Sequence, residues 1–210
     1  MITIALPKGR LGDKVYKLFA SIGYDCSAIY DDNRKLVFEN TEKGVRYLLV
    51  KPSDVAAYVY HGAADIGIVG KDILCECGLS VYELLDLKLG KCDMCIAAKN
   101  DYKEDTSRPI RVATKFPNIA KAHYMSFNRE IEIIKLNGSI EIAPLVDLAD
   151  VIVDIVETGT TLKENNLKVF QKILPISARL IANRASYTFN TDEINLLSER
   201  LQKALEEQAK

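Results

Sequence analysis

Acids, threonines and a glycine crowd into one short stretch of this 210-residue chain, between positions 154 and 161. Its polar members and its glycine are Asp154, Glu157, Thr158, Gly159, Thr160 and Thr161. Backbone N–H groups at a helix start attract anions, and threonine hydroxyls add donors for phosphate oxygens. The two carboxylates cannot bind phosphate, but they suit ribose hydroxyls or Mg²⁺ coordinated through water. The stretch therefore favours phosphate binding.

A plainer interpretation gives this stretch only a structural role. Thr158 and Thr160 would then cap a helix, with Gly159 as an ordinary tight turn. This interpretation does not account for Asp154, an acid inside an otherwise apolar run, or for Glu157 three residues later. Phosphate binding is the preferred hypothesis.

A strand and a helix are needed to position this stretch. Residues 151–156 are β-branched apart from Asp154, which is typical of a buried strand. After the turn, Leu167, Phe170 and Leu174 fall on one face of a predicted helix, which Pro175 ends. The predicted order is strand, Gly/Thr turn and helix, and Gly159 lets the backbone curl at the turn.

A second candidate loop, with two cations, follows the first predicted strand. Pro7-Lys8-Gly9-Arg10 separates the strand 2–6 from a helix with an apolar stripe over residues 11–22. In the plainer interpretation Lys8 and Arg10 are solvated loop charges. The glycine between them favours a loop that faces a ligand.

Gly67 interrupts the predicted strand 66–69, close to Asp65. Glycine weakens a strand unless a ligand or another backbone approaches closely, or unless it marks a bulge. Since turns along this chain repeatedly place glycine beside a charge, we expect a cleft built from strand ends.

The overall composition limits the class of protein. Apolar residues make up 48% and charged residues 27%, as in ordinary globular domains. A net charge of −1 provides no general basic field for nucleic acid. The chain has no apolar run long enough for a membrane and no signal peptide, so we expect a cytoplasmic protein.

Five cysteines, an odd number, indicate free thiols rather than a disulfide framework. Cys92 and Cys95 have a metal-ligand spacing, but they fall in a predicted strand, where residues three apart face opposite sides. We expect the cysteines to be small buried hydrophobic residues.

Alternating strands and helices predict an α/β fold with mostly parallel sheets and helices on both faces. We expect two lobes, one formed by residues 1–90 with 176–210 and the other by residues 91–175. The ligand site is expected in the cleft between the lobes, at the carboxyl ends of strands.

Five motifs resemble, in the same order, those of the ATP phosphoribosyltransferases, the first enzymes of histidine biosynthesis. They are Leu6-Pro-Lys-Gly-Arg10, Asn33-Arg-Lys-Leu36, Gly62-Ala-Ala-Asp-Ile-Gly-Ile-Val-Gly70, Glu157-Thr-Gly-Thr-Thr-Leu162 and Ile176-Ser-Ala-Arg-Leu-Ile-Ala-Asn-Arg184. The resemblance implies a fold similar to type II periplasmic binding proteins. It also implies a pentosyltransferase, which converts ATP and 5-phosphoribosyl 1-pyrophosphate to N1-(5-phosphoribosyl)-ATP and pyrophosphate with Mg²⁺.

The resemblance further implies roles for particular residues. Phosphoribosyl pyrophosphate is expected to bind Asp154, Glu157, Thr158, Gly159, Thr160, Thr161 and Leu162, with Mg²⁺ held by the two acids through water. ATP is expected to bind Lys8, Gly9, Asp65, Gly67 and Lys115. The expected catalytic groups, which neutralise phosphates, are Arg10, Arg34 and Lys51. Many members carry arginine in place of Lys51, and lysine keeps the charge but loses the two-pronged hydrogen bonding of a guanidinium.

The chain resembles the short form of this family, since little sequence follows the last predicted helix, which starts at Thr191. That form works with a histidyl-tRNA-synthetase-like regulatory subunit. We expect a homodimer alone, a hetero-octamer with this partner, and feedback inhibition by histidine only in the complex.

Two alternatives remain open. A two-lobed small-anion binding protein without catalysis would share the fold, although such a protein normally carries a secretion signal. A type I phosphoribosyltransferase acting on another base would share the phosphate loop. Its pattern places two adjacent acids before Thr-Gly-Gly, whereas Ile155 follows Asp154 here.

Overall fold

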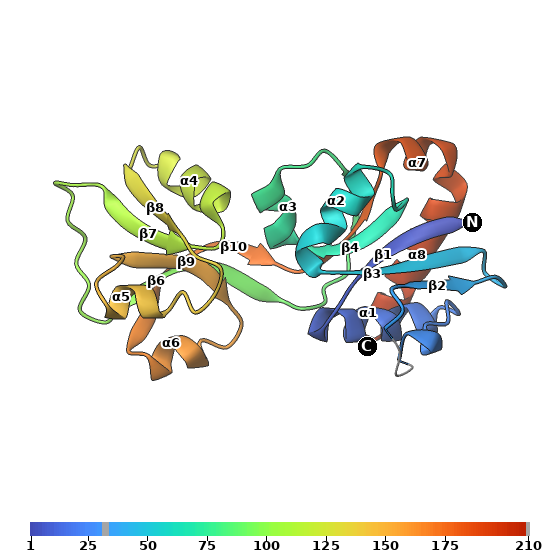
Figure 1. Ribbon diagram of the computed structural model, residues 1–210, viewed down its shortest axis with the longest axis horizontal. Helices are drawn as coiled ribbons and strands as arrows, with labels where there is room; N and C mark the ends of the chain where they lie inside the picture. Colours follow the sequence, from blue (N-terminus) through green and yellow to red (C-terminus); the bar gives the residue numbers. More distant parts are fainter. Residues whose placement is uncertain (31–33, 209–210) are drawn as a thin grey trace. The chain divides into compact units, whose positions relative to one another are not determined.

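The computed structural model describes residues 1–30 and 34–208, and these residues form two compact units. The first unit comprises Met1–Gly90 and Ser177–Lys210, and the second comprises Lys91–Ile176. Strands and helices follow one another in both units (Figure 1), so the predicted α/β class is confirmed. Asn33, at the start of the motif 33–36, lies outside the described residues, as do the last two positions of the chain.

The first unit is built on a six-stranded sheet with the order β2-β3-β1-β4-β11-β5. Its strands are β1 (Ile2–Pro7), β2 (Val37–Asn40), β3 (Val45–Val50), β4 (Ile66–Gly70), β5 (Tyr82–Asp86) and β11 (Ala178–Ala182). β1 runs parallel to both β3 and β4. Pro7, Val50 and Gly70 therefore end their strands at the same edge of the sheet, where the loops of a candidate site are expected.

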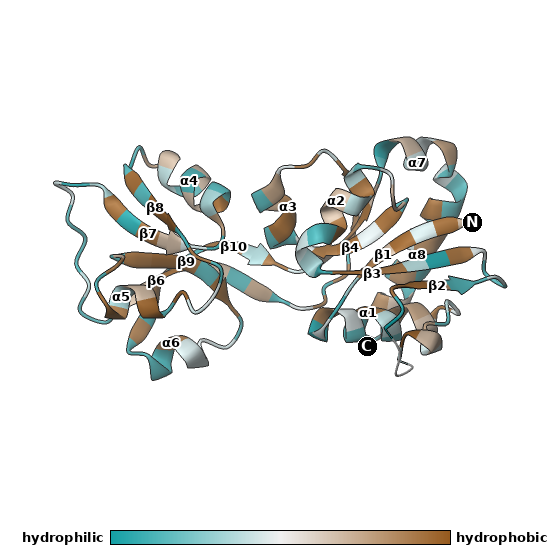
Figure 2. Ribbon diagram, in the orientation of Figure 1, coloured by the Kyte–Doolittle hydropathy of each residue, from teal (hydrophilic) through white to brown (hydrophobic). Residues whose placement is uncertain are grey.

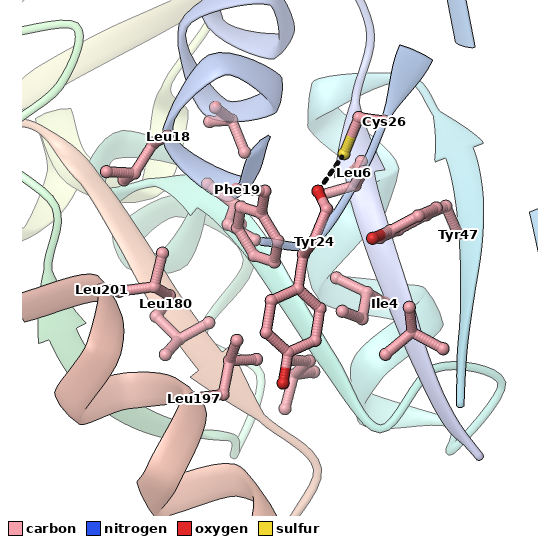
Figure 3. Close-up of a cluster of buried hydrophobic side chains, with 14 of the residues drawn as sticks. Ile4, Leu6, Leu18, Phe19, Tyr24, Cys26, Tyr47, Leu180, Leu197 and Leu201 are labelled. Atoms are coloured by element: carbon pink, nitrogen blue, oxygen red, sulfur yellow. Dashed lines mark hydrogen bonds between the residues drawn. The ribbon is translucent and has the colours of Figure 1, made fainter. Parts of the chain in front are cut away.

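Helices cover both faces of this sheet. They are α1 (Arg10–Ser21), α2 (Val55–Tyr60), α3 (Lys71–Cys77), α7 (Arg184–Phe189) and α8 (Thr191–Gln208), with 3₁₀ turns η1 (Ser27–Tyr30) and η2 (Pro52–Asp54). Successive strand residues face opposite sides, so Leu6 packs with residues of α1 and α8 while Ala5 packs with α2. Figure 3 shows the first of these clusters, with Phe19 of α1 and Leu201 of α8. The prediction of helices on both faces is confirmed for this unit.

The second unit is built on a five-stranded sheet with the order β10-β6-β9-β7-β8. Its strands are β6 (Cys92–Lys99), β7 (Ile110–Thr114), β8 (Ile131–Lys135), β9 (Val151–Val156) and β10 (Leu167–Ile176), and its helices are α4 (Pro117–Met125), α5 (Ile142–Leu145) and α6 (Thr160–Glu164). β9 has the predicted bounds, and its first three residues are buried. Figure 2 shows this strand as largely hydrophobic and α6 as more hydrophilic. A buried strand thus leads into an exposed helix start.

Strand pairing is mixed, and the prediction of mostly parallel sheets is wrong. The parallel pairs are β1–β3, β1–β4, β7–β8 and β7–β9, whereas β2–β3, β4–β11, β5–β11, β6–β9 and β6–β10 are antiparallel. The hairpin β2–β3 is joined by four residues, 41–44, which is too short for a parallel crossover. Strand–helix alternation correctly predicted only the parallel groups β3-β1-β4 and β9-β7-β8.

Residues 167–176 form β10 rather than the predicted helix. α6 ends at Glu164, and Asn166 adopts φ 55°, a left-handed conformation that stops the helix. β10 then pairs antiparallel with β6 over residues 167–176, with two register shifts. Leu167 and Phe170 lie three apart on a helical wheel, but Val169 and Phe170 also favour a strand. Pairing with β6, which the local pattern cannot reveal, decides between the two.

The cysteine prediction holds in part. All five cysteines lie in the described residues, and none forms a disulfide. Cys26 and Cys95 are buried as predicted, whereas Cys75 and Cys77 are exposed on α3. Within residues 1–30 and 34–208, no helix combines the length and the apolar character needed to cross a bilayer.

Candidate functional site

The turn after β9 has the geometry predicted for an anion-binding loop. Gly159 has φ 75° and ψ 3° and occupies the N-cap position of α6. A Cβ at this position would meet only Val156 Cγ1, at 3.8 Å, so glycine is needed for its left-handed backbone rather than for lack of space. The N–H of Lys163 donates to the Gly159 carbonyl (3.0 Å), which closes the first helical turn.

The threonines of this turn lie on its surface. Thr158, Thr160 and Thr161 are exposed, and the hydroxyls of the first two are 3.0 Å apart. α6 has no side-chain hydrogen bond at its N-cap. Leu162, by contrast, is buried among the apolar residues of the sheet face. The turn is thus anchored by one leucine and has three exposed threonine side chains, and the N–H of Thr160 donates to Oγ1 of Thr158 (3.4 Å).

Asp154 is a half-buried carboxylate two-thirds of the way along β9. Burial is the largest influence and raises the pKa of Asp154 above its usual range, with Glu141 acting in the same direction. The N–H of Ile155, which donates to Oδ1 (2.8 Å), and the charge of Lys115 both oppose this rise in pKa. Glu157 lies exposed at the turn. The two acids therefore differ, since one is partly desolvated and the other is solvated.

Lys115 lies in the second unit, at the same sheet edge as the phosphate loop. Thr114, the last residue of β7, pairs with Val153 of β9, so the next residues along are Lys115 and Asp154. The lysine was predicted to bind ATP together with Lys8 and Gly9. The structure places it beside Asp154, because β7 and β9 are parallel neighbours.

In the first unit, the strand ends of β1 and β3 bring other predicted residues together. The N–H of Lys8 donates to the Val50 carbonyl (3.0 Å), which places Lys8 beside the residue that precedes Lys51. A hollow of about 410 Å³ opens here, and Lys8, Gly9 and Arg34 all line it. Lys51 is exposed at the end of β3. Three of the predicted cations thus gather at one sheet edge.

Other residues of this hollow were missed by sequence reasoning. Its lining also includes Asp13, Tyr16, Ile29, Tyr30, Lys35, Leu36 and Leu49. Lys35 adds a further cation, and its position beside Arg34 was the available signal. Arg10, which was predicted to be catalytic, is exposed at the first position of α1.

Asp65 and Gly67 do not join this group. Asp65 precedes β4 and accepts a hydrogen bond from the N–H of Thr3 (2.7 Å) near the beginning of β1, at the opposite edge from Lys8. Gly67 is buried, and a Cβ there would lie 2.8 Å from methyl groups of both Val55 and Val59. The close approach that the glycine permits is that of α2, so the structure indicates a packing role.

No three His, Cys, Asp or Glu side chains among the described residues gather closely enough to hold a metal by themselves. Mg²⁺ usually takes one or two carboxylates and completes its shell with water and substrate phosphates. The half-buried carboxylate of Asp154 and the exposed one of Glu157 fit such a shared site.

Known proteins with the same architecture are found by sequence and by structure. A model of the family described as HisG: ATP phosphoribosyltransferase matches residues 51–203. ATP phosphoribosyltransferase of Brachyspira hyodysenteriae is 62% identical over 206 residues, covering 98% of this chain and 100% of the relative. That of Listeria monocytogenes serovar 1/2a is 48% identical over 207 residues, covering 99% and 97%.

A solved structure shares both the fold and the sequence pattern. It is an ATP phosphoribosyl transferase (HisG:HisZ) complex from Thermotoga maritima, which matches with a TM-score of 0.86 and 34% identity over 99% of this chain and 100% of that chain. The chain belongs to the ATP phosphoribosyltransferase family, the transferases that join ATP to 5-phosphoribosyl 1-pyrophosphate in the first step of histidine biosynthesis.

Proposed function

We propose that the second unit of this chain binds the phosphoribosyl group and that the first unit neutralises polyphosphate. The observation that carries the proposal is the left-handed Gly159 at the start of α6, which follows a strand containing the half-buried Asp154. The loop N–H groups and the hydroxyls of Thr158, Thr160 and Thr161 hold the 5-phosphate, while Leu162 anchors the loop. Asp154 and Glu157 accept hydrogen bonds from the ribose hydroxyls.

Lys115 contributes a cation beside this loop. Its charge acts on Asp154, which is the neighbouring strand's acid. The charge of Lys115 opposes the rise in the pKa of Asp154 that burial causes, and it attracts the phosphates of the same substrate. We therefore assign Lys115 to phosphoribosyl pyrophosphate rather than to ATP.

The cations of the first unit neutralise the phosphates of ATP and of the departing pyrophosphate. Lys8, Gly9 and Arg34 line one hollow. Lys51 is exposed directly after β3, and Arg10 is exposed at the first position of α1. Negative charge grows on pyrophosphate as its bond to the anomeric carbon breaks. Fixed cations that meet this charge stabilise the transition state more than the ground state.

The reaction needs positioning and charge more than a nucleophilic side chain. N1 of adenine attacks the anomeric carbon, the carbon–oxygen bond to pyrophosphate breaks, and the ribosyl carbon passes through an oxocarbenium-like state. Mg²⁺, when bound, would neutralise pyrophosphate oxygens. Asp154 and Glu157 would hold it through water.

Two measurements test the assignment of the phosphate loop. They are the binding of phosphoribosyl pyrophosphate and the formation of phosphoribosyl-ATP, which is followed by absorbance. Gly159→Val is expected to abolish both, because a β-branched residue does not readily adopt φ 75°. Thr160→Val keeps the shape but removes a donor, which should cost about 1–3 kcal/mol of binding. Gly138→Val is the matched control, a glycine of the same unit around which a Cβ would meet nothing within 4 Å. Unchanged affinity in both loop variants would remove the loop from the site, and binding without turnover would favour a non-catalytic anion binder.

A regulatory partner chain is part of the same proposal. The Thermotoga maritima relative is a complex of two kinds of chain. We propose that this chain is a homodimer alone and forms a hetero-octamer with a histidyl-tRNA-synthetase-like subunit, through which histidine inhibits. Mass measurement and activity, with and without that subunit, test this. Inhibition of the purified chain alone by histidine would contradict it.

A further inference from the structure

Thr114 is one of few polar residues in the interior of the described chain, and it lies at the end of β7. Its side chain is fully buried. Its hydroxyl donates to the Val153 carbonyl (2.6 Å) and accepts a hydrogen bond from the N–H of Phe116 (2.8 Å). A buried hydroxyl needs such partners, but this one joins two different chain segments.

The two hydrogen bonds bracket the two residues that were assigned to the sugar phosphate. The bond from the Phe116 N–H closes a turn around Lys115. The bond to the Val153 carbonyl fixes the peptide group that leads into Asp154. A single hydroxyl group therefore fixes the backbone next to both Lys115 and Asp154.

Asp154 lies on the face of the sheet where Ala113 and Ile152 pack together in one apolar cluster, because alternate residues of a strand face the same way. Lys115 follows the last residue of β7, in the turn that the Phe116 N–H closes, and its charge acts on Asp154. Thr114 and Val153 point to the opposite face. The threonine thus acts from the face opposite the Asp154 side chain, through the backbone beside both residues.

We propose that Thr114 is a positioning residue, whose hydroxyl fixes the spacing of Lys115 and Asp154 and thereby the grip on the phosphoribosyl substrate. The inference rests on the proposed function of these two residues. A threonine that only filled space at the end of β7 would need its methyl group and volume, not its hydrogen bonds.

Three substitutions separate these roles. Thr114→Val keeps the volume but removes both hydrogen bonds, and Thr114→Ser keeps the hydroxyl but removes the methyl group. Lys115→Ala removes the charge that Thr114 is proposed to place. Each variant is made in the full chain, and its phosphoribosyl pyrophosphate affinity is measured by calorimetry with Mg²⁺, alongside kcat, KM and thermal unfolding.

We expect Thr114→Val to weaken binding about tenfold, since two buried hydrogen bonds are lost, and Thr114→Ser to stay within about threefold of the original chain. In the Lys115→Ala background, Thr114→Val should add less than about twofold, because residues that act together are not additive. If Thr114→Val does not fold, Thr114→Cys replaces it, and its weakly donating thiol should give an intermediate loss.

Equal weakening by Thr114→Ser and Thr114→Val would assign the effect to packing and overturn the proposal. A full tenfold loss of affinity on adding Thr114→Val to Lys115→Ala would also overturn it. So would a Thr114→Cys variant that binds phosphoribosyl pyrophosphate as tightly as the original chain. If Lys115→Ala itself binds normally, the role of Lys115 is wrong and the inference falls with it. The Gly159 and Thr160 variants test the phosphate loop separately. Failure of the inference about Thr114 can therefore be distinguished from failure of the whole proposed site.

Discussion

Gly67 offers a direct test of packing against ligand binding. In Gly67→Ala the new Cβ would lie 2.8 Å from Val55 Cγ1 and 2.8 Å from Val59 Cγ2. Carbon atoms in contact prefer about 3.5–4.0 Å, so α2 and its methyl groups must withdraw by roughly 0.7–1.2 Å. Overpacking of this kind costs about 1–3 kcal/mol. At about 2–4 °C per kcal/mol for a chain of this size, Tm should fall by about 2–12 °C.

Thermal unfolding and the KM for ATP are measured on the same preparations. Together they decide whether Gly67 serves packing or ligand binding. The packing role predicts a lower Tm with a KM for ATP within about twofold of the original chain. Val59→Ala, added to Gly67→Ala, should return part of the lost stability, because it removes one of the two clashing methyl groups. Gly138→Ala is the control. An unchanged Tm with a KM for ATP raised about tenfold would refute the reasoning and return Gly67 to the ligand site.

Three further predictions concern charge and loop position. Asp150 binds Arg108 through two hydrogen bonds (2.8 and 3.0 Å), and this pairing lowers the pKa of Asp150. Asp150→Asn should therefore lose about 1–3 kcal/mol of unfolding free energy at neutral pH. The difference in stability from the original chain should vanish as the pH falls below about 4 and through the lowered pKa of Asp150. A difference that stays constant in acid would contradict this. Lys51→Ala should lower the single-turnover rate more than it weakens substrate binding, and Lys51→Arg should be active. An unchanged rate in Lys51→Ala would show that Lys51 is only a solvated surface charge. Gly12→Ala would place a Cβ against the Pro7 carbonyl oxygen and should displace the loop after β1, which raises the KM for ATP. An unaltered KM would show that this loop does not take part in nucleotide binding.

Local sequence patterns were sufficient where the determining contacts are local. The strand 151–156 and the left-handed glycine that follows it are both confirmed, since β-branched composition and a Gly/Thr turn act within a few residues. The family was also predicted correctly, because five separated motifs constrain it more than any single loop does.

The errors arose where distant segments decide the outcome. Residues 167–176 became a strand through pairing with β6, whose partner residues lie 68 to 84 positions earlier in the chain. Asp65 and Lys8 were both expected to bind ATP, but one precedes a strand and the other follows one, so they lie at opposite edges of the sheet. Strand order and direction, rather than composition, determine which loop residues meet.

The position of β11 has a consequence for how the chain is made. β11 lies between β4 and β5 in the first sheet, yet residues 87–177 must leave the ribosome before it does. The second unit is continuous and can complete its sheet as soon as Ile176 has emerged. Until β11 arrives, the backbone groups along one side of Ile66–Gly70 have no strand to pair with, and α8 has not yet been made to cover the sheet. A chain that is released before β11 is made therefore exposes an unpaired strand edge, which favours aggregation or degradation.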